Sequence, residues 1–101
     1  MAFKIIETAS ALPANIVTND DLTAIMETSN EWIESRTGIL ERRISETENT
    51  SDLCLRVAQT LLDKSGIAVS QINAIIVATM TPDYYTPSTA AIVQGRLGAD
   101  Q

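Results

Sequence analysis

The stretch Ala74-Ile75-Ile76-Val77-Ala78-Thr79 decides the fold class of this chain. It is an unbroken apolar run rich in β-branched residues, a pattern typical of a strand that is covered on both faces. Such strands occur in parallel sheets that carry helices on each face. The sequence therefore predicts a central strand over residues 74–79 of an α/β protein.

Helical signals lie on both sides of this run. A start signal at residues 49–52 precedes a helix that should end at Gly66, because its apolar residues recur on one helical face, at positions 54, 57, 58, 61 and 62. A second helix, capped by Ser88 or Thr86, should reach about Leu97 and end at Gly98. The strand thus stands between two helices.

The first half of the chain predicts shorter elements. Residues 3–8 form a candidate strand, and Thr18 with Asp21 should cap a helix over about residues 19–26. The sequence T-S-N-E at residues 28–31 has the form of a capping box for a helix over 29–36, which should stop at Gly38 before a strand over 39–44. Alternating strands and helices favour a mainly parallel sheet. We expect that sheet to be incomplete, because only three residues follow Gly98.

Composition excludes several classes of protein. The chain has 101 residues, 45% of them hydrophobic and 20% charged, which fits one soluble globular unit. A net charge of −6 with scattered basic residues argues against nucleic-acid binding, and neither a bilayer-spanning run nor a signal peptide is evident. One cysteine and no histidine leave no disulfide or zinc cluster to propose. We expect a cytoplasmic protein with no metal site and no membrane partner.

Cys54 and Trp32 could each have either a structural or a functional role. Cys54 shares the apolar stripe of its helix, so we interpret it as a buried core thiol rather than a nucleophile. Trp32 lies one helical turn from Thr28 and one from Arg36, which puts the three side chains along one side of the helix. An indole, a guanidinium and a hydroxyl suit the nucleotide end of a ligand such as coenzyme A, but a tryptophan anchored in the core is an equally good interpretation of the residues alone.

A family resemblance favours the binding role for Trp32 over the core role. Residues 28–44, T-S-N-E-W-I-E-S-R-T-G-I-L-E-R-R-I, resemble the N-terminal signature of β-ketoacyl-ACP synthase III, T-S-[D/N]-E-W-I-x-x-R-T-G-I-x-x-R-x-I. The surroundings agree: L-P at residues 12–13, T-N-x-D-L at 18–22, A-T at 78–79 and P-S-T-A-A-x-x-Q at 87–94. The resemblance implies that residues 1–101 are the N-terminal part of the first half-domain of a thiolase-like fold.

The resemblance also implies an activity for the whole enzyme. It would be a homodimeric acyltransferase of fatty acid synthesis that condenses an acyl-CoA primer with malonyl-ACP to give β-ketoacyl-ACP, CO2 and CoA, with no cofactor. The family's cysteine nucleophile and its histidine and asparagine partners would lie beyond residue 101, so no catalytic residue is expected here. The positions that match the family's CoA contacts are Thr28, Trp32 and Arg36, with Thr37 as a weaker one.

The loop over residues 81–87 holds two tyrosines and two prolines, which favours a contact surface over a plain linker. The resemblance implies a dimer interface here, with Tyr85 and Thr86 near the partner's acyl pocket. Thr86 stands where the family often has phenylalanine, so we hypothesise tolerance of longer or branched primers. Arg42 and Arg43 would alternate faces of a strand over residues 39–44, so at least one should point to water or to a carboxylate, and we interpret them as solvated charges.

Two alternatives remain open. The chain could be a non-catalytic module for dimerisation and CoA contact that is stable by itself. It could also belong to a sibling thiolase-fold enzyme that makes polyketides, quinolones or hydroxymethylglutaryl-CoA. The sequence around the nucleophile would separate the second alternative from a synthase III.

Overall fold

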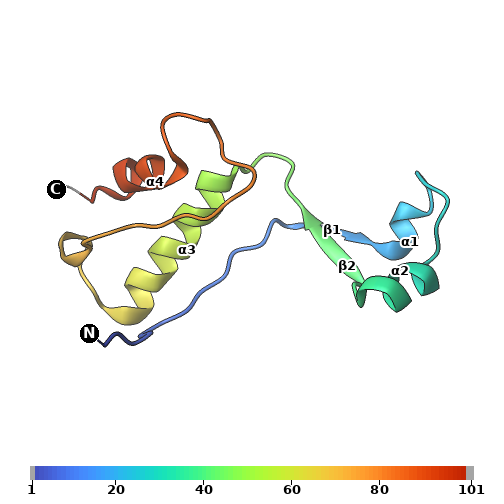
Figure 1. Cartoon of the computed structure of the whole chain (residues 1–101), viewed down its shortest axis with the longest axis horizontal. Coiled ribbons are helices and arrows are strands. Elements are labelled where there is room, and N and C mark those ends of the chain that lie inside the picture. Colours follow the sequence, from blue (N-terminus) through green and yellow to red (C-terminus); the bar gives the residue numbers. More distant parts are fainter. Residues whose placement is uncertain (1, 100–101) are drawn as a thin grey trace. The chain divides into compact units, whose positions relative to one another are not determined.

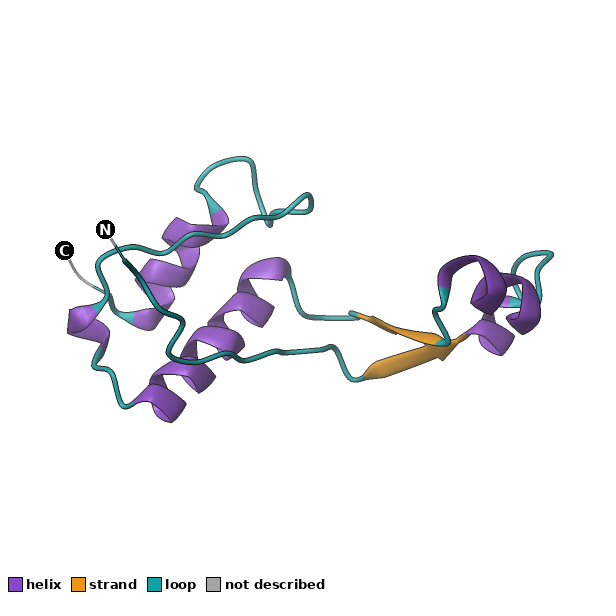
Figure 2. Ribbon diagram, turned by 60° about the horizontal axis from the view of Figure 1, so that its bottom comes forward, coloured by secondary structure: helices purple, strands orange, loops and turns teal. Residues whose placement is uncertain are grey.

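The computed structural model describes residues 2–99, which divide into two compact units. The first unit comprises residues up to Ala11 and from Glu48 onward, and the second comprises Leu12–Thr47. Figure 1 shows the elements of each unit, and Figure 2 separates helices from strands. We describe each unit by itself.

The second unit is built around a two-stranded antiparallel ladder. Strand β1 (Asn15–Thr18) pairs with β2 (Glu41–Ile44), and Asn15 lies opposite Ile44. Between them the chain forms the short helix α1 (Asn19–Leu22) and the helix α2 (Asn30–Thr37). The predicted strand over 39–44 is confirmed at residues 41–44, whereas β1 was not predicted from the sequence.

Helix starts in this unit follow local capping chemistry. Thr18 caps α1: its backbone N–H donates to Asp21 Oδ2 at 2.8 Å, and its hydroxyl accepts from Asp21 N at 3.2 Å. The helix ends at Leu22 rather than Met26, and Thr23 closes it by donating its hydroxyl to the Asp20 carbonyl. The predicted capping box at residues 28–31 was wrong, because Ser29 is the N-cap and Glu31 is only the second helical residue.

The first unit centres on helix α3 (Thr50–Ser65), which ends at Gly66 as predicted, and packs against α4 (Thr89–Leu97). A 3-10 turn, η1 (Val69–Gln71), separates α3 from the extended residues 72–79. Ser88 caps α4, since its hydroxyl accepts from Ala91 N, and Gly98 closes the helix in the left-handed conformation. Both predicted helices of this half are therefore confirmed.

The predicted strands over 3–8 and 74–79 do not form. Both segments are extended along α3, and together with α3 and α4 they line a hollow of about 300 Å³ through Ile6, Leu62, Ile75 and Val93. Within residues 2–99 the sheet consists of the antiparallel strands β1 and β2 alone, so the parallel pairing is not formed in the described residues, in keeping with the expectation of an incomplete sheet. A strand needs a hydrogen-bonded neighbour, and an apolar pattern does not supply one.

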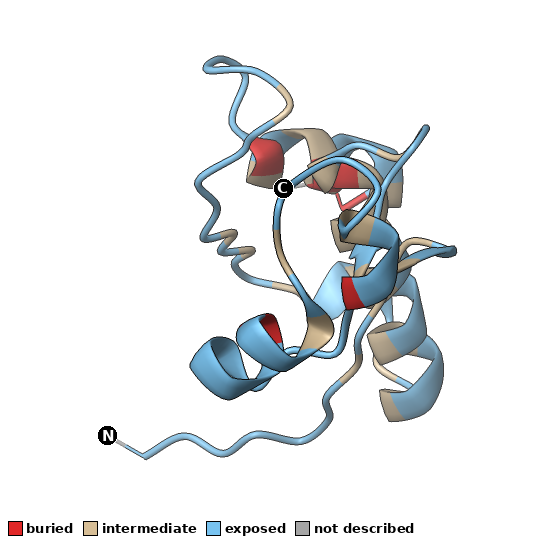
Figure 3. Ribbon diagram, turned by 90° about the vertical axis from the view of Figure 1, so that its right-hand side faces the viewer, coloured by how far each residue is buried: buried red, intermediate tan, exposed pale blue. Residues whose placement is uncertain are grey.

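Few of the described residues are fully buried, as Figure 3 shows. Val93, at 2% exposure, is the best covered apolar residue, whereas Ile76 is 92% exposed. Residues 74–79 therefore present one face to α3, through Ile75 and Val77, and leave the other face open. The prediction that this run is covered on both faces does not hold within the described residues.

Candidate functional site

Helix α2 carries the predicted binding residues. Ser29 starts it by accepting a hydrogen bond from Trp32 N at 3.1 Å. Gly38 ends it at φ 71°, a left-handed conformation that glycine adopts without a Cβ penalty. Only Ile33 on this helix is buried, at 8% exposure, so the helix turns most of its surface outward.

Trp32 lies on that outward surface. The residue is 55% exposed, and the Arg36 guanidinium carbon lies 5.2 Å from the centroid of its ring. A guanidinium at this distance from an indole makes a cation–π contact, worth about 0.5–1 kcal/mol at exposed sites. The contact presents a flat aromatic face and a positive charge side by side.

A hollow of about 230 Å³ adjoins the indole. It is lined by Glu27, Thr28, Ser29 and Trp32. The structure thus brings together Thr28 and Trp32 in one depression, with Arg36 against the indole. Thr37 is engaged differently: its hydroxyl donates to the Ile33 carbonyl at 2.7 Å and accepts from Ile39 N at 3.1 Å, so it serves the end of the helix.

A buried polar cluster supports α2, and the sequence did not reveal it. Asn19 is 1% exposed, and its side-chain amide donates to Asn30 Oδ1 at 2.9 Å and to the Ile39 carbonyl at 2.7 Å. Arg42 Nη2 donates to Asn19 Oδ1 at 2.7 Å, and Arg42 Nη1 donates to the Val17 carbonyl at 3.2 Å. The prediction of a solvated charge was wrong for Arg42. The β1–β2 register, which places Arg42 opposite Val17, was the missing signal.

The aromatic loop belongs to the first unit and is anchored at the start of α3. Asp83 accepts from Ser51 N at 2.8 Å and from the Ser51 hydroxyl at 2.5 Å, and Thr50 donates its hydroxyl to the Thr81 carbonyl. Tyr84 is 63% exposed and Tyr85 is 99% exposed. The loop thus holds its aromatic side chains in the open, and Thr86 is exposed beside them.

Other candidate chemistry is sparse. Cys54 lies on the apolar face of α3, as predicted, but it is only partly buried and lines a hollow with Val57, Leu61 and Ile75. Among residues 2–99, no group of three histidine, cysteine, aspartate or glutamate side chains could hold a metal ion. No helix in the described part of the chain is long and apolar enough to cross a membrane.

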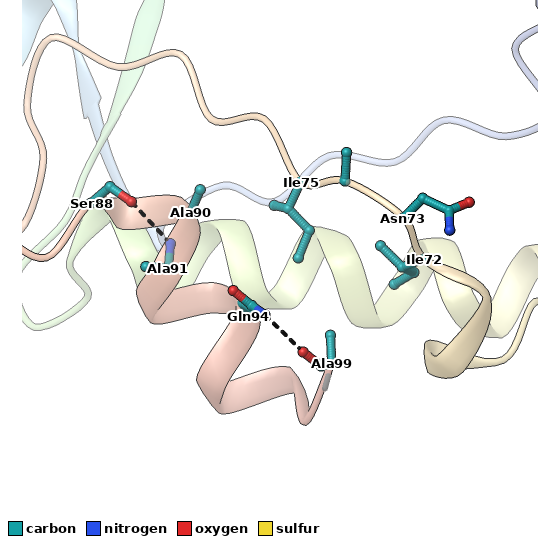
Figure 4. Close-up of a pocket in the computed structure, with 9 residues that line it drawn as sticks. Ile72, Asn73, Ile75, Ser88, Ala90, Ala91, Gln94 and Ala99 are labelled. Carbon is teal, nitrogen blue, oxygen red and sulfur yellow. Dashed lines mark hydrogen bonds between the residues drawn. The ribbon is translucent and has the colours of Figure 1, made fainter. Parts of the chain in front are cut away.

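A further hollow, of about 220 Å³, lies between residues 72–75 and α4. Figure 4 shows the small side chains Ala90 and Ala91 on the helix side and Ile72 and Ile75 across from them. Gln94 Nε2 donates to the Ala99 carbonyl at 3.0 Å at one end of the hollow. Its lining holds no charged side chain, which sets it apart from the Trp32 depression.

Comparison with solved structures gives the class of protein. The chain superposes with a TM-score of 0.92 on the 3-oxoacyl-[acyl-carrier-protein] synthase III of Aquifex aeolicus, at 43% identity over 96% of this chain and 32% of that one. It also superposes, with a TM-score of 0.86 at 28% identity, on the priming β-ketosynthase of the R1128 polyketide pathway, over 99% of this chain and 33% of that one. The chain is a partial α/β piece of the thiolase-like fold.

Sequence comparison matches the chain to part of one kind of enzyme. The chain is 99% identical over its 101 residues to the β-ketoacyl-[acyl-carrier-protein] synthase III of Latilactobacillus sakei. In sequence and in fold it matches a segment of β-ketoacyl-ACP synthase III. The chain spans about 31% of the length of that relative, and no family model matches it.

Proposed function

We propose that this chain is the CoA-contacting part of a β-ketoacyl-ACP synthase III, an acyltransferase that condenses an acyl-CoA primer with malonyl-ACP. The chain contributes the binding of acyl-CoA through Thr28, Trp32 and Arg36, with Thr37 as a weaker contact at the end of the helix. The observation that carries the proposal is the half-exposed indole of Trp32 with the Arg36 guanidinium against it, beside an open depression. A tryptophan retained only for packing would hide that area.

The geometry suits the nucleotide end of CoA. An adenine ring stacks on an indole face, and a guanidinium offers a planar pair of donors to a phosphate. The Thr28 hydroxyl, in the same depression, supplies a polar contact. Glu27 also lines the depression, so the phosphates are expected on the Arg36 side, away from that carboxylate.

The condensation itself falls to residues outside this segment. Cys54 lines a hollow with apolar side chains of α3 and residues 75–78, and that lining contains no basic side chain. A thiol activated to attack a thioester needs a neighbouring base or a helix N-terminus, and Cys54 lies beyond the first turn of its helix. We accordingly assign the segment no catalytic residue, no metal and no cofactor, with acyl-CoA as substrate.

The assembly and location follow from the same proposal. The loop with Tyr84 and Tyr85 is the candidate homodimer contact, because exposed aromatic side chains held in place are typical of interfaces. Thr86, smaller than phenylalanine, would leave room for longer or branched primers, which activity with acyl-CoAs of increasing length would reveal. The whole enzyme is proposed to act in the cytoplasm, without nucleic-acid or membrane partners.

The test is the variant Trp32→Ala in the full-length relative. Loss of one stacked ring costs about 1–3 kcal/mol, so KM for acyl-CoA should rise about tenfold or more while KM for malonyl-ACP stays unchanged. Glu34→Gln, exposed on the same helix, is the matched control and should leave both values unchanged. Unchanged KM for acyl-CoA in Trp32→Ala would refute the proposal.

Two observations bear on the alternative functions, a stand-alone module and a sibling condensing enzyme. Residues 12–47, which hold the proposed CoA contacts, form a compact unit of their own, which fits a stand-alone module for CoA contact. The match to a polyketide priming enzyme, at 28% identity, fits a sibling condensing enzyme less well than the 43% match fits a synthase III. CoA binding by the isolated chain would favour the module, and the product formed by the full-length protein would identify the sibling.

A further inference from the structure

The helix that carries the proposed CoA contacts is poorly anchored by apolar packing. α2 has eight residues, and Ile33 is its one buried residue. Isolated helices shorter than about 12 residues are marginal in water, so tertiary contacts must hold this one in place. One isoleucine restrains the position of a helix but not its rotation.

Asn19 supplies the missing restraint, because it is bonded to a residue at each end of α2. One amide hydrogen goes to Asn30, the first residue of the helix, and the other goes to Ile39, just after the Gly38 stop. The Asn19 backbone N–H also donates to the Leu40 carbonyl at 3.1 Å. The two helix ends are thus tied to one buried side chain.

Arg42 fixes which way that amide faces. Its guanidinium donates to Asn19 Oδ1, so the oxygen is turned toward β2 and both amide hydrogens are turned toward α2. Its second contact, to the Val17 carbonyl, ties the guanidinium to β1. The side-chain oxygen and both amide hydrogens of Asn19 therefore have partners, as a buried amide requires.

From this arrangement we infer that Asn19 and Arg42 are positioning residues for the Trp32 and Arg36 contacts. They act through α2 and touch no ligand themselves. This inference rests on the proposed CoA contact of α2 and adds what sets the orientation of that helix. Small displacements of a binding group weaken binding strongly, so a change in the amide should appear in the affinity for acyl-CoA.

The test compares one near-isosteric variant and one charge-preserving variant in the full-length relative. Asn19→Asp keeps the acceptor for Arg42 but replaces both donors toward α2 with an anion, and should raise KM for acyl-CoA about tenfold. Arg42→Lys keeps the charge but not the two-armed contact, and should give a smaller rise. In both, kcat and KM for malonyl-ACP should stay unchanged, a pattern that general loss of stability would not produce.

Arg43→Lys is the matched control, because Arg43 follows Arg42 on β2, is exposed and donates to the Pro13 carbonyl. It should behave as the parent. If Trp32→Ala weakens acyl-CoA binding while Asn19→Asp and Arg42→Lys do not, the positioning role alone is refuted. If Trp32→Ala has no effect, the proposed function fails and the inference fails with it. Should Asn19→Asp not fold, Arg42→Lys decides: an unchanged KM refutes the positioning role.

Discussion

The two units of this chain are stabilised by different interactions. In residues 12–47, hydrogen bonds close the structure: a paired ladder, capped helices and the Asn19 cluster. In residues 2–11 and 48–99, two helices pack on each other, and extended segments lie along α3 with one face open. In residues 12–47 the polar groups named here have hydrogen-bond partners, whereas in residues 2–11 and 48–99 apolar side chains are only partly covered.

The difference shows which unit leaves apolar surface uncovered. Asn19 is buried with all its groups paired, whereas Ile76 is an isoleucine that is 92% exposed. Burial of an isoleucine side chain contributes about 1.5–3 kcal/mol, and that contribution is unused in this chain. The unit with α3 and α4 is therefore the one whose stability should respond most to added contacts.

Core truncation should give the largest effect and separate the units. Val93→Ala removes two methyl groups at a site that is 2% exposed and should destabilise the α3–α4 unit by about 2–3 kcal/mol. Ile33→Ala should do the same to residues 12–47. Peptide-resolved hydrogen exchange should show faster exchange in the mutated unit only. Equal acceleration in both units would contradict an effect confined to the mutated unit.

Loosening the aromatic loop should give an intermediate effect. Asp83→Asn removes the anion that accepts from the Ser51 amide and hydroxyl, and hydrogen bonds to charged groups contribute about 1.5–3 kcal/mol each when well shielded. Because Asp83 is partly exposed, we expect about 1 kcal/mol in denaturant unfolding. Asp63→Asn, on the exposed side of α3, is the control. Equal costs for the two variants would rule out a specific anchor.

Acid should have the smallest effect on stability. It should also distinguish Asp52 at the start of α3 from Asp21 at the start of α1. The Asn49 backbone N–H, followed by Arg96 at 2.6 Å, lowers the pKa of Asp52 below its usual 3.8. The Thr18 backbone N–H and hydroxyl lower the pKa of Asp21. Because both pKa values are lower in the folded state, the stabilisation is complete above pH 3.8 and is lost as pH falls through the folded values.

Arg96→Gln makes this last comparison decisive. Only Asp52 has the guanidinium partner, so its pKa should rise toward 3.8 in the variant while that of Asp21 stays unchanged. Carboxyl NMR titration of both residues gives the measurement. A pKa of Asp52 that does not respond would assign the whole shift to the Asn49 amide.

The sequence predicted several local features and missed those that depend on pairing between distant segments. The Thr18 cap and the Gly38 and Gly66 stops follow from residues within one or two helical turns of each other. For Trp32 the residues alone left both a buried and an exposed position open. The Asn19–Arg42 bond spans 23 positions and depends on the β1–β2 register, which no local pattern contains. Residues 74–79 have the apolar pattern of a strand, but pairing is a property of two segments.

That unpaired run has a practical consequence for anyone who handles the chain. Residues 74–79 are uncharged, contain no proline and are rich in β-branched side chains, and within the described residues they join no ladder. Extended segments of this composition, with free backbone donors and acceptors, template growth of intermolecular cross-β stacks. A charged substitution at Ile76, whose side chain already faces water, would act as a gatekeeper against fibril growth while leaving the α3 side untouched.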